Sequence, residues 1–126
     1  MENLIIHATK VSPEIVLQGD GKLRIEGKII TENAMVTFEP IFIWLSDFHN
    51  PYVEFNIDLE YINTSASMQL FSLLRKLDAD ANISSVVVNW YYEEDDEEHL
   101  ETGQLFEEKL ERIVFHYKLH QQRGAA

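Results

Sequence analysis

The 126-residue sequence contains no cysteine, only three prolines and five glycines, and far fewer basic than acidic side chains. Without cysteine the chain has no disulfide, no thiolate nucleophile and no zinc–cysteine site. Ten Lys and Arg against 22 Asp and Glu give a net charge of −12 when the histidines are neutral. Because this charge would repel phosphate backbones, we expect no nucleic-acid partner.

Long apolar stretches are missing as well. No apolar run approaches the roughly 20 residues of a membrane-spanning helix, and Met1-Glu2-Asn3-Leu4 lacks the basic region and apolar core that begin a secretory signal. We therefore expect no membrane insertion and a cytoplasmic location. The sequence also has no nucleophile elbow, glycine-rich phosphate loop or HExxH helix, so it offers no case for an enzyme.

The residues that are present indicate one globular unit. Hydrophobic residues make up 45% of the chain, which is too much for a disordered protein. The length suits one domain with one core, and no linker or repeat divides it. We predict a single domain over residues 1–126, with a flexible tail at residues 121–126.

Alternation of apolar and polar residues, together with β-branched and aromatic runs, predicts the strands. An irregular lead-in is expected to end at Pro13. After it we predict a β-hairpin over residues 14–27 that turns at Gly19-Asp20-Gly21, and then strands over residues 52–62, 83–92 and 113–120.

Helical spacing of apolar residues predicts three helices between these strands. The first follows Thr31-Glu32-Asn33, whose side chains suit a helix start. Pro40 either kinks this helix or begins a shorter one over 40–48, and we favour one kinked helix. The second and third, after Ser65 and over 98–111, are expected to turn these residues inward: Ala66, Leu70, Leu73, Leu74, Leu77, Leu100, Leu105, Phe106 and Leu110.

This order of elements predicts an α/β (α+β) fold in which a β-hairpin is followed by alternating helices and strands. Helical crossovers favour parallel strands, so the sheet should be mixed. A parallel sheet that is covered on both faces has strands that are apolar on both faces. Here only residues 83–92 have that character, so we predict helices mainly on one face of the sheet and a polar, open face opposite.

The best candidate site is the junction Tyr61-Ile62-Asn63-Thr64-Ser65, where a strand ends and a helix begins. The free N–H groups and the dipole of a helix start accept an anion readily. A phosphate on a hydroxyl here would meet those donors and add about −1.5 to −2 charge. Alternatively, Thr64 or Ser65 is an ordinary N-cap, which the residues alone favour.

The acidic run Glu93–Glu98 and the histidines are weaker candidates. Carboxylates suit Mg²⁺ or Ca²⁺, but the run lacks the alternation and glycine of an EF-hand and is typical of a solvated loop or a first helical turn. His116 and His120 share a strand face without being adjacent, and spacing gives His7, His49 and His99 no partner. We therefore predict no metal site and no catalytic residue.

Three motifs in this order resemble the SiaC family of bacterial biofilm-regulation phosphoproteins. They are Tyr61-Ile-Asn-Thr-Ser65 before a helix, Thr31-Glu-Asn33 before the first helix, and Trp90-Tyr-Tyr-Glu-Glu-Asp-Asp96. The resemblance covers about residues 9–117. It implies a STAS-like regulatory domain, the fold of anti-sigma factor antagonists, that has no enzymatic activity and no cofactor.

The resemblance also implies a phosphorylation switch at Thr64, with Ser65 as the alternative acceptor. A partner kinase would phosphorylate Thr64 and a PPM-type phosphatase would reverse this. The unphosphorylated form would bind and activate a GGDEF diguanylate cyclase, which raises cyclic-di-GMP and promotes aggregation or biofilm growth. The implied partner-binding residues are Asn63, Thr64, Ser65, Glu32 and Asn33.

The chain departs from the family pattern at two places. Ala66 replaces the second serine of a common Asn-Thr-Ser-Ser motif, and Ile30-Thr31-Glu32-Asn33 stands where many members have Tyr-Pro-Glu-Asn. Two other functions are compatible with the sequence. One is an anti-sigma factor antagonist with the same switch, and the other is a metal-dependent hydrolase that uses the acids of residues 93–98 with His99.

Overall fold

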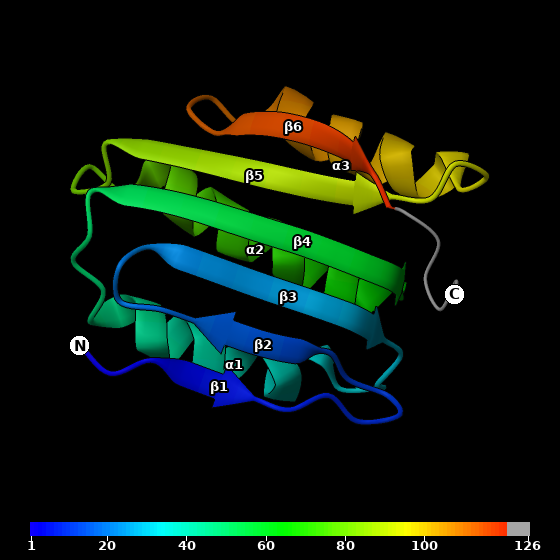
Figure 1. Ribbon diagram of the computed structural model, residues 1–126, viewed down its shortest axis with the longest axis horizontal. Coiled ribbons are helices and arrows are strands. Elements are labelled where there is room, and N and C mark those ends of the chain that lie inside the picture. The colour runs from blue at the N-terminus through cyan, green and yellow to red at the C-terminus, as the bar shows by residue number, and fades with distance from the viewer. Residues whose placement is uncertain (121–126) are drawn as a thin grey trace.

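The computed structural model describes residues 1–120, so the tail expected at residues 121–126 lies outside the described residues. Within these residues the chain forms six strands and three helices (Figure 1). In chain order they are β1 Leu4–Ile6, β2 Glu14–Leu17, β3 Lys22–Ile29, α1 Ala34–Ser46, β4 Tyr52–Ile62, α2 Thr64–Ala79, β5 Ser85–Tyr92, α3 Glu97–Lys109 and β6 Val114–Leu119.

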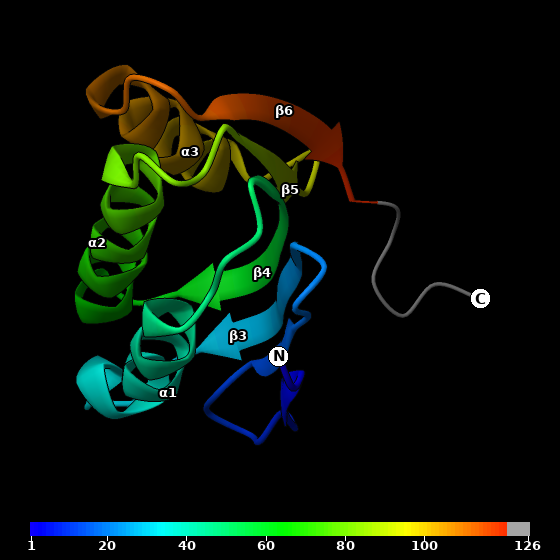
Figure 2. The same cartoon turned by 90° about the vertical axis from the view of Figure 1, so that its left-hand side faces the viewer.

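The six strands form one mixed sheet in the order β1-β2-β3-β4-β5-β6. The β1/β2 and β2/β3 pairs are antiparallel, and β3 to β6 are parallel. Each parallel step contains one helix, and all three helices cover the same face of the sheet (Figure 2). This architecture confirms the predicted α/β fold with a hairpin, a mixed sheet and helices on one face.

The first two helices also agree with their sequence patterns. A single helix, α1, continues through Pro40, so the alternative of a shorter helix that begins at Pro40 is wrong. The stripe predicted for α2 is buried along its whole length: Ala66, Leu70, Leu73, Leu74 and Leu77 are all at most 2% exposed. These leucines belong to the same buried core as the sheet residues Phe55, Ile57 and Val88.

Two parts of the prediction are wrong. Residues 4–6 form strand β1 on the edge of the sheet, where an irregular lead-in was expected, because three residues are too few to show an alternation. In α3, Leu105 is 54% exposed instead of buried, while His99 and Gly103 face the core. The wide ring of Trp90 fills the space under this helix, so small and flat side chains take the inner positions.

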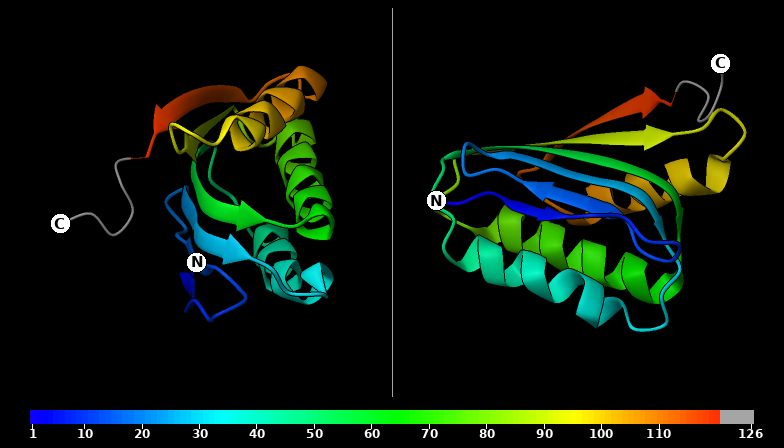
Figure 3. Two further views of the ribbon diagram at one scale, coloured as in Figure 1. Left: turned by 90° about the vertical axis from the view of Figure 1, so that its right-hand side faces the viewer. Right: turned by 60° about the horizontal axis from the view of Figure 1, so that its bottom comes forward.

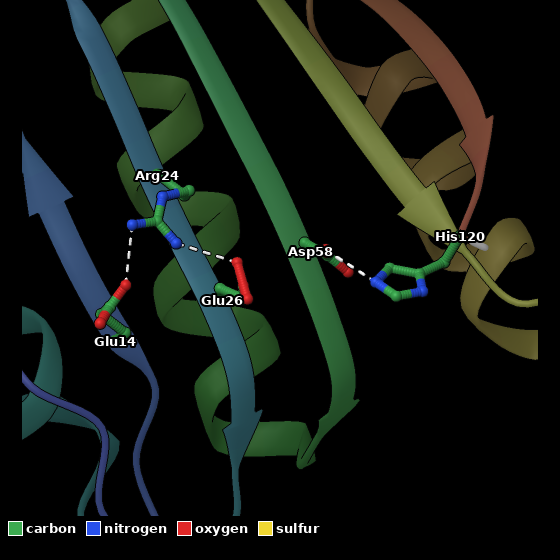
Figure 4. Close-up of polar contacts among 5 residues, drawn as sticks. All are labelled: Glu14, Arg24, Glu26, Asp58 and His120. Atoms are coloured by element: carbon green, nitrogen blue, oxygen red, sulfur yellow. Dashed lines mark hydrogen bonds and ion pairs between the residues drawn. The ribbon is translucent and has the colours of Figure 1, made fainter. Parts of the chain in front are cut away.

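The face of the sheet opposite the helices is polar, as predicted. Figure 4 shows its side chains projecting on the side away from α2. Arg24 pairs with Glu14 at 2.7 Å and with Glu26 at 2.9 Å, and Asp58 lies 3.1 Å from the Nε2 atom of His120. Ion pairs at partly exposed positions contribute little to stability. The stability of the sheet therefore comes mainly from its other face, which is buried under the helices.

The carboxylate of Asp78, in the last turn of α2, holds the turn between α3 and β6. It accepts backbone N–H groups from Glu111 at 3.0 Å, Arg112 at 2.7 Å and Ile113 at 3.1 Å. Burial alone would raise the pKa of Asp78, but these three N–H donors and the Arg112 guanidinium outweigh it and hold the pKa below its usual value. The carboxylate form therefore stabilises the folded state.

We expect Asp78→Ala to lower the free energy of unfolding by about 1–3 kcal/mol at pH 7, because backbone donors lose their acceptor. A depressed folded-state pKa contributes stability above the unfolded pKa and loses it as the pH falls. The difference between wild type and Asp78→Ala should therefore narrow below about pH 4. Urea unfolding at several pH values measures it. The control, Asp95→Ala at an exposed position, should stay within about 0.5 kcal/mol, and a pH-independent gap at Asp78 would contradict the account.

Candidate functional site

The candidate site lies where the parallel strands end. β3, β4 and β5 run in the same direction, so their last residues, Ile29, Ile62 and Tyr92, lie at one end of the sheet (Figure 1). The loops that follow are residues 30–33, residue 63 and residues 93–96. Ligands and partners of open α/β sheets commonly bind at this end. The sequence motifs singled out above fall on all three of these loops.

Asn63 joins two of these loops. It is the N-cap of α2, and its Oδ1 atom accepts the N–H of Ala66 at 2.9 Å. Its Nδ2 atom donates to the carbonyl of Thr31 at 2.9 Å, and its backbone N–H donates to the carbonyl of Ile29 at 3.0 Å. A single side chain therefore fixes both the start of α2 and the position of the loop before α1.

Through this contact the structure brings the predicted partner-binding residues to one surface. Glu32 and Asn33 are exposed in the loop held by Asn63, and Thr64 and Ser65 are exposed in the first turn of α2. Asn33 occupies the N-cap position of α1, but its side chain makes no capping hydrogen bond.

The N-cap of α2 is Asn63, so the simpler interpretation of Thr64 or Ser65 as the cap is wrong. Asn, Ser and Thr have similar N-cap preferences, and only the backbone path decides among neighbours. Thr64 lies one position further along, with its side chain exposed. Its hydroxyl is therefore not needed to begin the helix and can be modified without removing the cap.

Thr64 lines one end of an open groove between α2 and α3, with a volume of about 460 Å³. The middle of the groove is apolar, with Met68 exposed and the rings of Phe71 and Phe106 5.1 Å apart. Lys109 lies at its wall and over the Phe71 ring at 5.8 Å. An exposed apolar strip therefore extends along the groove from Thr64.

The surroundings of Thr64 are acidic. A smaller hollow beside it, of about 160 Å³, shares Ile62 with the groove and is lined by Glu60, Asp96 and Glu98. Glu98 also lines the main groove, as Thr64 does. A phosphate on Thr64 would therefore add negative charge to a negative surface. At the start of α2 the phosphate oxygens would lie near both the N–H groups of the first turn and these carboxylates.

The end of the acidic run and His99 have structural roles. Asp96 caps α3 by accepting the N–H of His99 at 3.0 Å, and Glu97 and Glu98 form the acidic first turn. His99 is buried and stacks on Trp90 with ring centroids 4.8 Å apart. Across residues 1–120, no three His, Asp or Glu side chains come together in a group that could hold a metal ion. The hydrolase alternative thus has no ligand set in this part of the chain.

We expect Asn63→Ala to lower the free energy of unfolding by about 2 kcal/mol, since it removes the cap of α2 and the donor to Thr31. Asn63→Asp keeps a capping oxygen but cannot donate to the Thr31 carbonyl, so its loss should be smaller, about 1 kcal/mol. Urea unfolding gives both values, and hydrogen exchange should show faster exchange at residues 30–33 in both variants. Equal stability of Asn63→Ala and wild type would contradict the role assigned to Asn63.

Together these observations define a small α/β domain that presents a hydroxyl on a helix start beside a groove and that gathers no metal-ligating cluster in its described residues. A family profile described as SiaC family regulatory phosphoprotein matches residues 6–120. The chain therefore belongs to the SiaC family of regulatory phosphoproteins, as the resemblance in the sequence indicated. In the described residues no helix has the length and apolar character needed to cross a membrane.

Solved structures agree with this assignment. The chain is similar to SiaC of Pseudomonas aeruginosa, with a TM-score of 0.80, 24% identity, and 95% of this chain and 100% of that chain covered. It is also similar to a chain in the crystal structure of the diguanylate cyclase SiaD in complex with its activator SiaC from Pseudomonas aeruginosa. That match has a TM-score of 0.73 and 28% identity, and it covers 93% of this chain and 99% of that chain. A comparison with curated proteins found no match.

Proposed function

We propose that this protein is a non-enzymatic switch that binds and activates a diguanylate cyclase when Thr64 is unphosphorylated and releases it when Thr64 carries a phosphate. Two comparisons support the proposal. The chain belongs to a family of regulatory phosphoproteins, and it is similar to one chain of a solved complex between a diguanylate cyclase and its activator SiaC. By raising cyclic-di-GMP, the complex would promote aggregation or biofilm growth.

The observation that carries the proposal is the position of Thr64. Its exposed side chain lies at the end of the α2–α3 groove, while Asn63 performs the capping that the helix requires. A modification there changes the surface without unfolding the helix start. Ser65, which is also exposed in the first turn, is the alternative acceptor.

The switch needs two enzymes that act on Thr64. We propose a dedicated protein kinase that adds the phosphate and a PPM-type phosphatase that removes it, both working in the cytoplasm. Phosphorylation at an exposed helix start requires no unfolding of the substrate, because the hydroxyl is already accessible. Glu32 and Asn33, on the loop that Asn63 holds next to Thr64, are proposed to contribute to partner binding.

Two measurements test the function. Mass spectrometry of the protein purified from its own cells should locate phosphate on Thr64. In a reconstituted assay, the unmodified protein should stimulate cyclic-di-GMP synthesis by the diguanylate cyclase encoded next to it. Thr64→Ala should stimulate equally and should no longer respond to the kinase. Stimulation that is equal for the phosphorylated and unmodified proteins would contradict the switch, and no stimulation by either form would contradict the cyclase as the partner.

A further inference from the structure

Helix α1 is more apolar than its place in the fold requires. Its inner face, with Phe38, Ile41 and Leu45, is buried against the sheet. Its outer face is apolar too, with Val36 63% and Ile43 61% exposed. A helix that is apolar on all sides is normally enclosed by protein. Yet α1 is the outermost helix of the layer, with α2 beside it on one side only (Figure 3).

The exposed side of α1 forms a groove with the residues that lead into β1. The indole of Trp44 donates to the carbonyl of Glu2 at 2.9 Å, and the side chain of Asn3 accepts the N–H of Gly19 at 3.2 Å. The first bond holds this segment against α1, and the second ties it to the turn between β2 and β3, so residues 1–4 form one wall of the groove. The groove between them has a volume of about 740 Å³, and its apolar lining is formed by Met1, Leu4, Val36, Pro40, Ile43 and Trp44.

Three carboxylates, those of Glu2, Glu39 and Asp47, border this apolar lining, and its described residues include no lysine or arginine. The charge selects among possible occupants. A second copy of this acidic chain, an anionic membrane or a nucleic acid would bring negative charge against these carboxylates. A segment with an apolar stripe flanked by lysine or arginine matches both the lining and its border.

We propose that this groove, the α1 groove, is a docking site for a basic amphipathic helix of a partner protein. The 13 residues of α1 extend for about 20 Å, which gives an occupant three to four turns of contact. Apolar residues at helical spacing on the partner helix would cover Val36 and Ile43. Basic residues on either side of that apolar stripe would contact Glu39 and Asp47. The groove is built from α1 and residues 1–4, whereas Thr64 lies on the groove between α2 and α3. The protein therefore offers two separate binding surfaces.

The test uses an 18-residue leucine–lysine peptide whose order gives an amphipathic helix, titrated into the ¹⁵N-labelled full chain. Shift changes should appear in α1 and residues 1–4, and fluorescence anisotropy gives the affinity. Ile43→Glu places a charge in the α1 groove and should weaken binding by at least about 10-fold. Val114→Glu, which changes an exposed apolar residue on β6 that lines neither groove, should leave the affinity within about 2-fold.

Two control peptides distinguish the contribution of the apolar stripe of the peptide from that of its lysine charges. A scrambled leucine–lysine peptide and a leucine–glutamate helix should each bind at least about 10-fold more weakly. The proposal is overturned by absent binding, by equal binding of a control peptide, by unchanged affinity of Ile43→Glu, or by shifts confined to α2 and α3. It is also overturned if sedimentation shows a dimer, or flotation shows retention on phosphatidylcholine vesicles, that Ile43→Glu abolishes. Circular dichroism of both variants establishes that each is folded.

Discussion

Thr64→Glu is expected to weaken binding of the diguanylate cyclase about 30- to 150-fold and to remove its activation. A partner that covers Thr64 must strip water from the new carboxylate, and a desolvated charge without a counter-ion costs several kcal/mol. Only about 2–3 kcal/mol of this cost needs to appear in the binding free energy to give the stated change. Glu60, Asp96 and Glu98 line the adjoining hollow and add repulsion of the new carboxylate from that side.

The position of the charge, not its amount, should decide this result. The chain already carries a net charge of −12, so one further carboxylate hardly alters its overall field. Ser84→Glu adds the same charge at an exposed residue before β5, at the other end of the parallel strands. It should keep the affinity within about 3-fold. Thr64→Val, which is close in shape and neutral, should bind like wild type.

Ser65→Glu tests the alternative acceptor. If Thr64 is the switch residue, Thr64→Glu should disrupt the complex at least as strongly as Ser65→Glu, and kinase treatment should add phosphate to Ser65→Ala but not to Thr64→Ala. Isothermal titration calorimetry with the cyclase gives the affinities. Similar affinities for wild type, Thr64→Glu and Ser65→Glu would show that the helix start lies outside the interface.

The sequence predicts best those elements whose side chains face one environment along their whole length. β4 is observed with the predicted bounds of residues 52–62, and its burial alternates from Tyr52 to Glu60, because one of its faces lies under the helices and the other is polar. The stripe on α2 is buried for the same reason. In both cases the local period of the sequence alone predicts which side chains are buried.

The sequence predicts less well where burial depends on a distant residue. Period and hydrophobicity favour Leu105 as an inner residue of α3, but the inner positions belong to His99 and Gly103, which fit the ring of Trp90. At the candidate site the same limit applies. Asn63, Thr64 and Ser65 are all acceptable caps, and the bond from Asn63 to Thr31, 32 positions earlier in the sequence, favours the first of them.

The contact between α3 and the sheet leads to the second large effect, at Gly103. In an ordinary helix interior, replacing glycine by alanine stabilises the protein by about 1 kcal/mol. Here a Cβ atom would lie 2.8 Å from Cε2 and 2.9 Å from Nε1 of Trp90. The indole is fully buried and donates to the carbonyl of His99 at 3.1 Å, so it has little room to move.

We therefore expect Gly103→Ala to lower the free energy of unfolding by about 2 kcal/mol, as overpacking in a filled core does. Urea unfolding followed by circular dichroism measures it, and Gln104→Ala at the exposed neighbouring position should change stability by less than about 0.5 kcal/mol.

Trp90→Phe tests the cause of this loss. The smaller ring vacates space above Gly103, so Gly103→Ala should cost at least about 1 kcal/mol less in that background than in wild type. Additive losses would show that the alanine destabilises α3 for a reason other than contact with the indole.

Because α3 forms one wall of the groove that ends at Thr64, Gly103→Ala should also reduce activation of the cyclase even when most of the protein is folded. In the Trp90→Phe background, Gly103→Ala should recover part of that activation. Such a recovery would show that the lost activation comes from a change in the shape of the groove and not from the charge at Thr64.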